Sequence, residues 1–242
     1  MPADLRLDGV GVRYGGVQAL DRVSLDVVPG AVLGLIGPNG AGKTTLINAT
    51  TGFAKLATGT IALGERRIDG LPPYRVARAG IARTYQNIRL FGALDVRTNL
   101  AAGAYAQEGR LGDDNARALL ARAGIPDVAL DARSAALPYG DQRRLEIARA
   151  LAARPAIVML DEPAAGMNPA ETTRLVQTIR DIAQAGLGVL LIEHDMSLVR
   201  AACDRVVVLN FGTVLAMGTP AEIARDPAVI EAYLGTSAET PA

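Results

Sequence analysis

The sequence predicts an α/β fold: a largely parallel β-sheet covered on both faces and interrupted by an all-helical insertion. Beyond residue 155, short apolar runs alternate with amphipathic segments, which is the pattern of parallel strands joined by helical crossovers. Between Val96 and Arg154, alanine, leucine and arginine dominate and β-branched residues become sparse, which favours helices. A glycine-rich run between an early apolar strand and a helix is a third feature of such folds.

The composition excludes several classes of protein. The 242 residues are 50% hydrophobic and 21% charged, which is typical of a globular chain that can bury a sizeable core. No apolar run reaches the roughly 18–20 residues that cross a bilayer, and the N-terminus lacks a signal-like pattern, so we expect neither a membrane span nor secretion. The single cysteine, Cys203, fits a reducing compartment. The 25 basic and 25 acidic residues balance without a basic stripe, which argues against a nucleic-acid partner.

Each element of the predicted fold has a local signature. Strands are expected where β-branched and leucine residues cluster, and helices where apolar residues recur every three to four positions. The predicted strands are residues 5–10, 23–28, 31–36, 60–63, 157–160, 188–193 and 205–209. The predicted helices are residues 43–51, 116–123, 143–153, 170–184 and 196–202. Residues 236–242 have the composition of a loose polar tail.

The glycine-rich run fits the pattern G-x-x-x-x-G-K-[ST] of a phosphate-binding loop, although a glycine turn that only caps a helix is the alternative. Glycines let successive N–H groups point inward, and the helix N-terminus adds the positive end of its dipole. Lys43 is one of only two lysines among 25 basic residues, and its compact charge suits the β- and γ-phosphates better than an arginine fork. The predicted nucleotide-binding residues of this loop are Gly37, Pro38, Asn39, Gly40, Ala41, Gly42, Lys43, Thr44 and Thr45.

Two further predicted strands end in residues suited to phosphate chemistry. Asp161 and Glu162 follow the apolar run 157–160, and the carboxyl ends of parallel strands form the edge at which α/β folds bind ligands. There Asp161 can hold Mg²⁺, and Glu162 can polarise the water that attacks the γ-phosphate. A helix cap or turn is the alternative for this acidic pair. The only histidine, His194, ends another apolar strand, and we expect it to contact the γ-phosphate rather than only to neighbour a helix cap.

Together these residues resemble those of the ATP-binding cassette (ABC) ATPases over nearly the whole chain. Tyr14 matches the aromatic residue that stacks on adenine in that family. Gln86 matches the glutamine that links Mg²⁺ and the attacking water to the transmembrane partner. The resemblance implies binding and hydrolysis of ATP with Mg²⁺. The implied catalytic residues are Glu162, His194, Gln86 and Lys43, and the implied Mg²⁺ ligands are Thr44, Gln86 and Asp161.

The same resemblance implies the domain organisation. We expect one ABC ATPase domain over residues 1–236, followed by a tail at residues 237–242. Its P-loop NTPase core, with a mainly parallel sheet and an antiparallel β subdomain, is expected at about residues 1–90 and 154–236. An α-helical subdomain is expected at about residues 91–153. The stretch between Phe91 and Leu137 is short for the branch of the family that the chain most resembles, so we expect one helix of the insertion to be trimmed.

The family's signature loop corresponds to Leu137, Pro138, Tyr139, Gly140, Asp141 and Gln142. Where the usual pattern is L-S-G-G-Q, Pro138 replaces the serine and offers neither a hydroxyl nor an N–H to a phosphate, and Asp141 replaces the glutamine. Gly140 and the following helix N-terminus still present backbone donors and a favourable dipole. In this family the loop acts on ATP bound by the opposite subunit, so the resemblance implies a head-to-tail dimer of identical or different ATPases.

Within the family, the sequence is most similar to the ATPases of branched-chain amino acid importers. The similar segments are residues 83–91, 137–142, 162–169, 192–196 and 218–235. This resemblance implies a cytoplasmic enzyme held on the inner face of the cell membrane by permease subunits, with a periplasmic or extracellular solute-binding protein as an indirect partner. The alternatives are an ATPase for urea, short amides or lipopolysaccharide export, a soluble ABC ATPase, or a non-hydrolysing subunit.

Three large apolar side chains mark the expected permease contact. Ile88, Leu90 and Phe91 follow Gln86 in a segment of otherwise loop-like polarity, at the junction between the core and the insertion. Any one of them could pack in the core, but three together favour a partly exposed patch, which often marks a protein contact. The resemblance implies a groove here, around residues 86–91, that receives a cytoplasmic helix of the permease.

Overall fold

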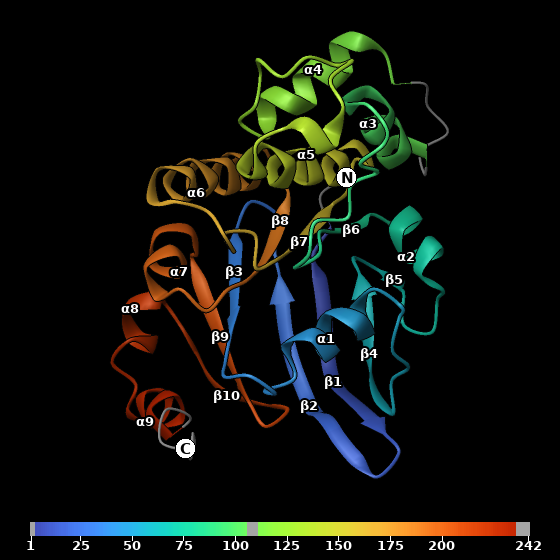
Figure 1. Cartoon of the computed structure of the whole chain (residues 1–242). Helices are drawn as coiled ribbons and strands as arrows, with labels where there is room; N and C mark the ends of the chain where they lie inside the picture. Colours follow the sequence, from blue (N-terminus) through green and yellow to red (C-terminus); the bar gives the residue numbers. More distant parts are fainter. Residues whose placement is uncertain (1–2, 106–110, 236–242) are drawn as a thin grey trace.

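A six-stranded sheet forms the centre of the computed structural model, which describes residues 3–105 and 111–235 (Figure 1). Its strand order is β10-β9-β3-β8-β7-β6, and every neighbouring pair is parallel except β10 with β9. The strands are β3 (Val32–Ile36), β6 (Ile81–Arg83), β7 (Ile157–Asp161), β8 (Gly188–Ile192), β9 (Arg205–Asn210) and β10 (Thr213–Gly218). Because β8 and β9 come much later in the chain than β3, the centre of the sheet is held by pairings across most of the sequence.

A second, antiparallel sheet packs on one face of the parallel sheet, as the resemblance implied. Its strand order is β2-β1-β4-β5, formed by β1 (Leu5–Tyr14), β2 (Val17–Val27), β4 (Thr58–Leu63) and β5 (Arg66–Arg67). Buried residues of this sheet, such as Val23, share one apolar core with Leu33 and Met159 of the parallel sheet. Helices α1 (Lys43–Thr50) and α2 (Pro73–Ala79) contribute to the same core.

Helices cover the opposite face of the parallel sheet. They are α6 (Pro169–Gln184), α7 (Met196–Ala202), α8 (Pro220–Ile223) and α9 (Pro227–Gly235). Along β7, Ile157 and Met159 belong to the first core, whereas Val158 and Leu160 belong to the core under these helices. This alternation explains why the strand is apolar throughout, since both of its faces are buried.

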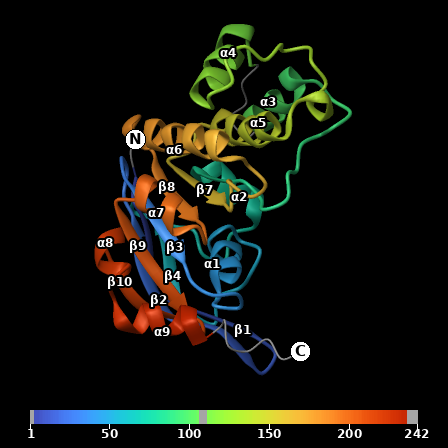
Figure 2. The same ribbon diagram turned by 60° about the vertical axis from the view of Figure 1, so that its left-hand side comes forward.

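A helical layer lies at the end of the molecule away from the β1–β2 hairpin in both views (Figure 2). It consists of α3 (Val96–Ala104), α4 (Asp113–Arg122), a 3₁₀ turn (Ser134–Ala136) and α5 (Tyr139–Ala152). Leu100, Leu120 and Leu145 form part of its own core. Ile147 and Leu151 of α5 instead pack into the core under α6 and α7. Helix α5 therefore joins the helical layer to the sheet. None of the helices in the described ranges combines the length and apolar character needed to span a bilayer.

The predicted strands and helices are confirmed in place and type, and the differences lie at their ends. The largest concerns β2, which begins at Val17 rather than at residue 23. Helix α5 begins at Tyr139 rather than at Arg143, so most of the expected signature loop is the first turn of a helix. Pro138 is its N-cap with φ −52°, and Asp141 places a negative charge in the first turn, where it complements the dipole. Short elements such as β6 and α2 were not predicted individually. The tail at residues 237–242 lies outside the described residues.

Strand β3, which leads to the glycine-rich loop, packs closely against Cys203. Cys203 is buried, and its Sγ lies 2.9 Å from the position that a Cβ at Gly34 of β3 would take. A side chain at Gly34 would therefore displace the sulfur or the strand. Burial raises the pKa of the Cys203 thiol to about 12.

Candidate functional site

The phosphate loop, residues 37–45, connects the carboxyl end of β3 to α1, as the sequence pattern predicted. Gly37 has φ 150°, and a Cβ there would overlap the backbone oxygen of Leu209 in β9. Gly42, which precedes α1, is left-handed with φ 104°. Both positions therefore require glycine, and the chain curls tightly into the helix N-terminus, where unpaired N–H groups attract anions.

Lys43 is the first residue of α1, and its ammonium group points toward the preceding loop. Its Nζ donates to the backbone oxygens of Gly37 at 2.6 Å and Pro38 at 3.0 Å. Burial lowers the pKa of this ammonium, and the negative charges of Glu162 and Asp161 oppose that shift. A partly buried cation held by neutral carbonyl oxygens is well placed to exchange them for phosphate oxygens.

A cavity of about 490 Å³ above the loop brings together residues from distant parts of the chain. Residues 39–45 line it with Gln86 and Glu162, and residues 17–19 and 211–212 complete the wall. The convergence follows from the sheet order. Gln86 lies beyond β6, Glu162 directly follows β7, and the phosphate loop follows β3, so all three lie beyond the carboxyl edge of parallel strands.

Glu162 is held in an unusual backbone conformation. Its φ of 46° is rare for a residue with a side chain, and its N–H donates to the oxygen of Ile192 at 3.0 Å. In this position its Oε2 accepts a hydrogen bond of 2.9 Å from Gln86 Nε2. His194 Nδ1 lies 4.0 Å from Glu162 Oε1, and the imidazole is 67% exposed. The structure therefore brings together Glu162, Gln86 and His194, three of the four residues expected to be catalytic.

Glu193 is a site residue that sequence reasoning missed. It is buried, its Oε1 accepts the N–H of Ala164 at 3.1 Å, and its Oε2 accepts the N–H of His194 at 3.3 Å. Burial raises the pKa of this carboxyl. Glu193 thus ties the segment after Glu162 to the segment that carries His194. An acidic residue closing an apolar strand was the available signal, as it was for Asp161.

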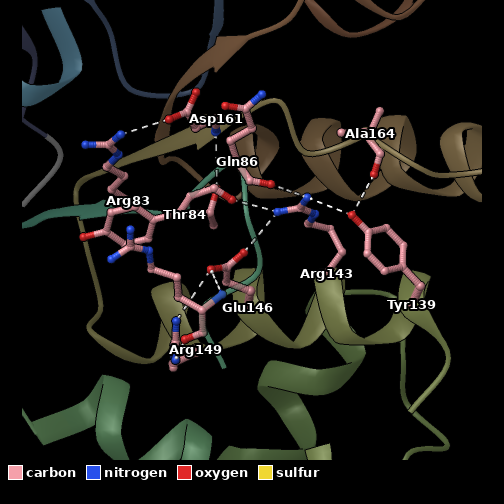
Figure 3. A network of polar contacts seen from close by, with 12 residues as sticks. Arg83, Thr84, Gln86, Tyr139, Arg143, Glu146, Arg149, Asp161 and Ala164 are labelled. Atoms are coloured by element: carbon pink, nitrogen blue, oxygen red, sulfur yellow. Dashed lines mark hydrogen bonds and ion pairs between the residues drawn. The ribbon is translucent and has the colours of Figure 1, made fainter. Parts of the chain in front are cut away.

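Asp161 is buried and is not among the described residues that line the cavity. Its Oδ2 accepts from Arg83 Nη2 at 2.9 Å (Figure 3). Arg83 Nη1 donates to Asn48 of α1 at 2.8 Å. The Asp161 N–H lies 3.3 Å from the hydroxyl of Thr84. Arg83 therefore links the ends of β6 and β7 to the helix that follows the phosphate loop.

Other predicted residues lie outside this cavity. Tyr14 is 52% exposed at the end of β1 and is not among the described residues that line it. The same holds for the signature segment 137–142, which lies at the start of α5. Tyr139 of that segment donates a hydrogen bond of 3.0 Å to the oxygen of Ala165. The cavity thus brings together the phosphate loop, Gln86 and Glu162, but neither Tyr14 nor the signature segment.

Phe211 is an aromatic wall residue that the sequence reasoning did not identify. It is 88% exposed and has φ 45°, in a turn between β9 and β10 where asparagine or glycine is usual. The next residue fixes this turn to the site, because Gly212 N donates to Ala41 O at 3.0 Å and Gly212 O accepts from Asp21 N at 2.8 Å. An exposed ring in a strained, anchored turn beside the phosphate loop is suited to contact a nucleotide base.

A glycine-rich loop at the centre of a parallel sheet, with carboxylates at the end of β7, one strand beyond its neighbour β8, defines a P-loop nucleotide-binding protein. Residues 20–165 match the family described as ABC transporter, and residues 213–239 match branched-chain amino acid ATP-binding cassette transporter. The chain therefore belongs to the ABC transporter family of ATP-binding, ATP-hydrolysing subunits.

Full-length relatives and solved structures agree with this assignment. The high-affinity branched-chain amino acid transport ATP-binding protein LivG of Salmonella typhimurium is 45% identical, over 96% of this chain and 97% of LivG. BraF of Pseudomonas aeruginosa, which has the same description, is 43% identical over 96% and 97%. The ADP conformation of MJ1267, an ATP-binding cassette of an ABC transporter, has a TM-score of 0.86 at 28% identity, over 97% of this chain and 100% of that chain.

The substitution Phe211→Asn tests whether the ring of Phe211 contacts the nucleotide base. Asparagine is favoured in left-handed turns, so the free energy of unfolding should stay unchanged or rise, while loss of the ring should weaken ATP binding about fivefold, because such stacking contributes about 1 kcal/mol. Binding of inorganic tripolyphosphate, which has no base, should not change. Calorimetric titration measures both ligands, and Phe211→Tyr is the control that keeps a ring. Native ATP affinity in Phe211→Asn would place the base elsewhere.

Proposed function

We propose that this chain is the ATP-binding and hydrolysing subunit of an ABC importer for branched-chain or related amino acids. LivG and BraF, which are named as high-affinity branched-chain amino acid transport ATP-binding proteins, match nearly its full length, and the C-terminal match is to the branched-chain family. These likenesses favour amino-acid import over urea, amide or lipopolysaccharide transport and over a soluble ABC ATPase. The chain then acts as one domain over residues 1–236, with a core (about 1–90 and 154–236) and a helical subdomain (about 91–153).

The hydrogen bond between Gln86 and Glu162 above the phosphate loop is the observation that carries the hydrolytic role. Phosphates bind to the loop N–H groups and to Lys43, which exchanges its carbonyl partners for phosphate oxygens. Glu162 takes a proton from the attacking water, and the Gln86 amide orients that water. His194, 4.0 Å from Glu162, can donate to the γ-phosphate from its exposed ring. A site with a base in place favours hydrolysis over a purely binding role.

Mg²⁺ fits the oxygen atoms that this edge of the sheet offers. Thr44 supplies a hydroxyl, Gln86 an amide oxygen and Asp161 a carboxylate, and Mg²⁺ prefers such donors together with substrate phosphates. Gln86 uses its amide nitrogen for Glu162, which leaves its oxygen for a cation, and Asp161 binds Arg83 through Oδ2, which leaves Oδ1. We propose these three residues as the ligands. The ion would neutralise charge that develops on the transferred phosphoryl group.

The signature segment, residues 137–142, is proposed to complete the site of a second ATPase subunit. In the described part of the chain it does not line its own cavity, yet it begins a helix whose N-terminus can present N–H groups to a phosphate. A head-to-tail dimer would bring this N-terminus to the partner's ATP. In such a dimer, ATP binding joins the two subunits and hydrolysis releases them.

A groove of about 600 Å³ between α2, β6 and the helical layer is the proposed permease site. Three exposed aromatic side chains line it: Phe53, Tyr74 and Phe91, at 60%, 57% and 52% exposure. Exposed aromatic clusters of this kind mark protein contacts. Of the other two predicted apolar residues, Ile88 is half-buried and Leu90 packs against the core of the helical layer. Docking here would hold the chain on the inner face of the membrane, with a solute-binding protein reached only through the permease.

Removal of the proposed base tests the mechanism. Glu162→Gln keeps the shape of the side chain and should leave ATP affinity within about twofold, while turnover falls by about 10²-fold or more, as for loss of a general base. Bound ATP should then persist and trap a dimer, which size-exclusion chromatography detects. Glu65→Gln removes an exposed carboxylate and serves as the control. Native turnover in Glu162→Gln would exclude Glu162 as the base.

A charge in the groove tests the docking site. Phe91→Asp should leave ATP binding and the unfolding midpoint of the isolated chain nearly unchanged, because the ring is half-exposed, but it should reduce co-purification with the permease at least tenfold and stop transport. Tyr105, at the end of α3, is an aromatic residue that is 81% exposed and does not line the groove. Tyr105→Asp introduces the same charge there and should change neither co-purification nor transport. Equal co-purification of Phe91→Asp and native chain would move the permease contact elsewhere.

The cargo is tested by uptake. Cells that lack this gene should lose high-affinity uptake of labelled leucine, isoleucine or valine, and the native gene should restore it. A Lys43→Ala gene should not, because the phosphates would then meet only backbone dipoles. Labelled urea provides the comparison. Loss of urea uptake with normal leucine uptake would assign the chain to an amide system instead.

A further inference from the structure

A buried arginine, Arg143 of α5, lies between the helical layer and the segment that carries Gln86 (Figure 3). Its side chain is 1% exposed. Nη1 donates to the backbone oxygen of Tyr85 at 2.7 Å, and Nη2 donates to that of Gln86 at 2.6 Å. One planar group thus holds two consecutive carbonyls, and so fixes the backbone from which the Gln86 side chain extends toward Glu162.

The same guanidinium also reaches the other side of the site. Nη2 lies 3.2 Å from the hydroxyl of Tyr139, and that hydroxyl donates to the oxygen of Ala165 at 3.0 Å. Ala165 N in turn donates to the backbone oxygen of Glu162 at 3.2 Å. With the Gln86–Glu162 hydrogen bond of 2.9 Å, these contacts close a ring. Two residues of α5 connect this ring to the helix: Arg143 binds the Gln86 side, and Tyr139, which Arg143 also contacts, binds the Ala165 side.

The ring is continuous with the wall of the groove. Glu146, also buried, pairs with Arg143 at 3.4 Å and accepts the N–H of Arg89 at 3.1 Å. Arg149 Nη1 donates to the oxygen of Arg89 at 2.6 Å. Glu146, Arg89 and Arg149 all line the groove. A displacement of the groove wall would therefore act on Arg143, and through it on the backbone of Gln86.

We infer that Arg143 is a positioning residue for ATP hydrolysis, which holds Gln86 against Glu162 and makes that contact depend on the position of α5. The inference rests on the proposed roles of Gln86 and Glu162. Lysine could not replace it, because a point charge cannot span two carbonyls and a hydroxyl at once. The competing explanation is that Arg143 only stabilises the fold and does not affect the position of Gln86.

The chain offers a matched control in the next residue. Arg144 is 2% exposed on the same helix, but it donates to the oxygen of Glu171 at the start of α6, away from Gln86. Both Arg143→Met and Arg144→Met remove a buried guanidinium and keep a long apolar side chain. Arg143→Met should lower kcat about tenfold with ATP Kd within about twofold, whereas Arg144→Met should keep kcat within about twofold at a similar unfolding midpoint. Equal loss of kcat in both variants would overturn the inference.

A double variant distinguishes positioning from a general loss of stability. If Arg143 acts through Glu162, adding Arg143→Met to Glu162→Gln should change turnover less than twofold, because the contact it supports has already lost its function. A further tenfold fall in the double variant would contradict the inference. Unchanged turnover in Glu162→Gln alone would instead overturn the proposed role of Glu162 as the base, so the two failures are distinguishable.

A milder substitution covers the case in which Arg143→Met does not fold. Tyr139→Phe removes only the hydroxyl from a side chain that is 46% exposed, so the fold should be retained. The substitution breaks the ring of hydrogen bonds between Arg143 and Ala165, so kcat should fall about threefold while the ATP Kd stays unchanged. All turnover measurements use the full chain assembled with its transport partners. Native kcat in Tyr139→Phe would show that the ring has no part in positioning.

Discussion

The parallel pairing of β3, β8, β7 and β6 is the constraint on which the site depends. These strands come from widely separated parts of the chain, and their shared direction places their carboxyl ends at one edge. Their register is fixed because both faces are buried. A slip of one strand by one residue would turn each of its side chains from one apolar core into the other. In the observed register Asp161 pairs with Ile192, and the Glu162 N–H bonds the oxygen of Ile192. The backbone of Glu162, the proposed base, is thus set by the sheet itself.

Helix α5 carries an unusual density of buried charge for an element that packs in two cores. Arg143, Arg144 and Glu146 are each nearly inaccessible to solvent. Replacing such groups with apolar residues is often neutral or stabilising, because the cost of desolvation offsets their attraction. The burial of Glu146 accordingly raises the pKa of its carboxyl despite three arginine contacts nearby. Stability alone therefore does not account for these charges. Arg143 and Glu146 instead bind the backbone of residues 85–89, whereas Arg144 binds the start of α6.

The sequence predicted most of the features that depend on a local residue pattern. Apolar runs identified the long strands, and the glycine and lysine spacing located the phosphate loop. Contacts between distant segments could not be read in the same way. Nothing near Phe211 in the sequence connects it with a loop that lies far upstream, because that proximity arises only from the pairing of β9 with β3. The ion pair of Arg83 with Asp161 likewise depends on β6 lying beside β7, and β6 is too short for its period to be recognised.

The packing of Cys203 against Gly34 has a practical consequence. Thiol reagents attack the thiolate, and here both the closed core and the raised pKa suppress it. As the only cysteine in the chain, Cys203 can be alkylated at an appreciable rate only when the centre of the sheet opens. The labelling rate of the unmodified protein therefore reports the opening equilibrium of the strand that carries the phosphate loop. Any nucleotide that binds the closed form will slow labelling in proportion to its occupancy, and so gives its affinity without an attached probe.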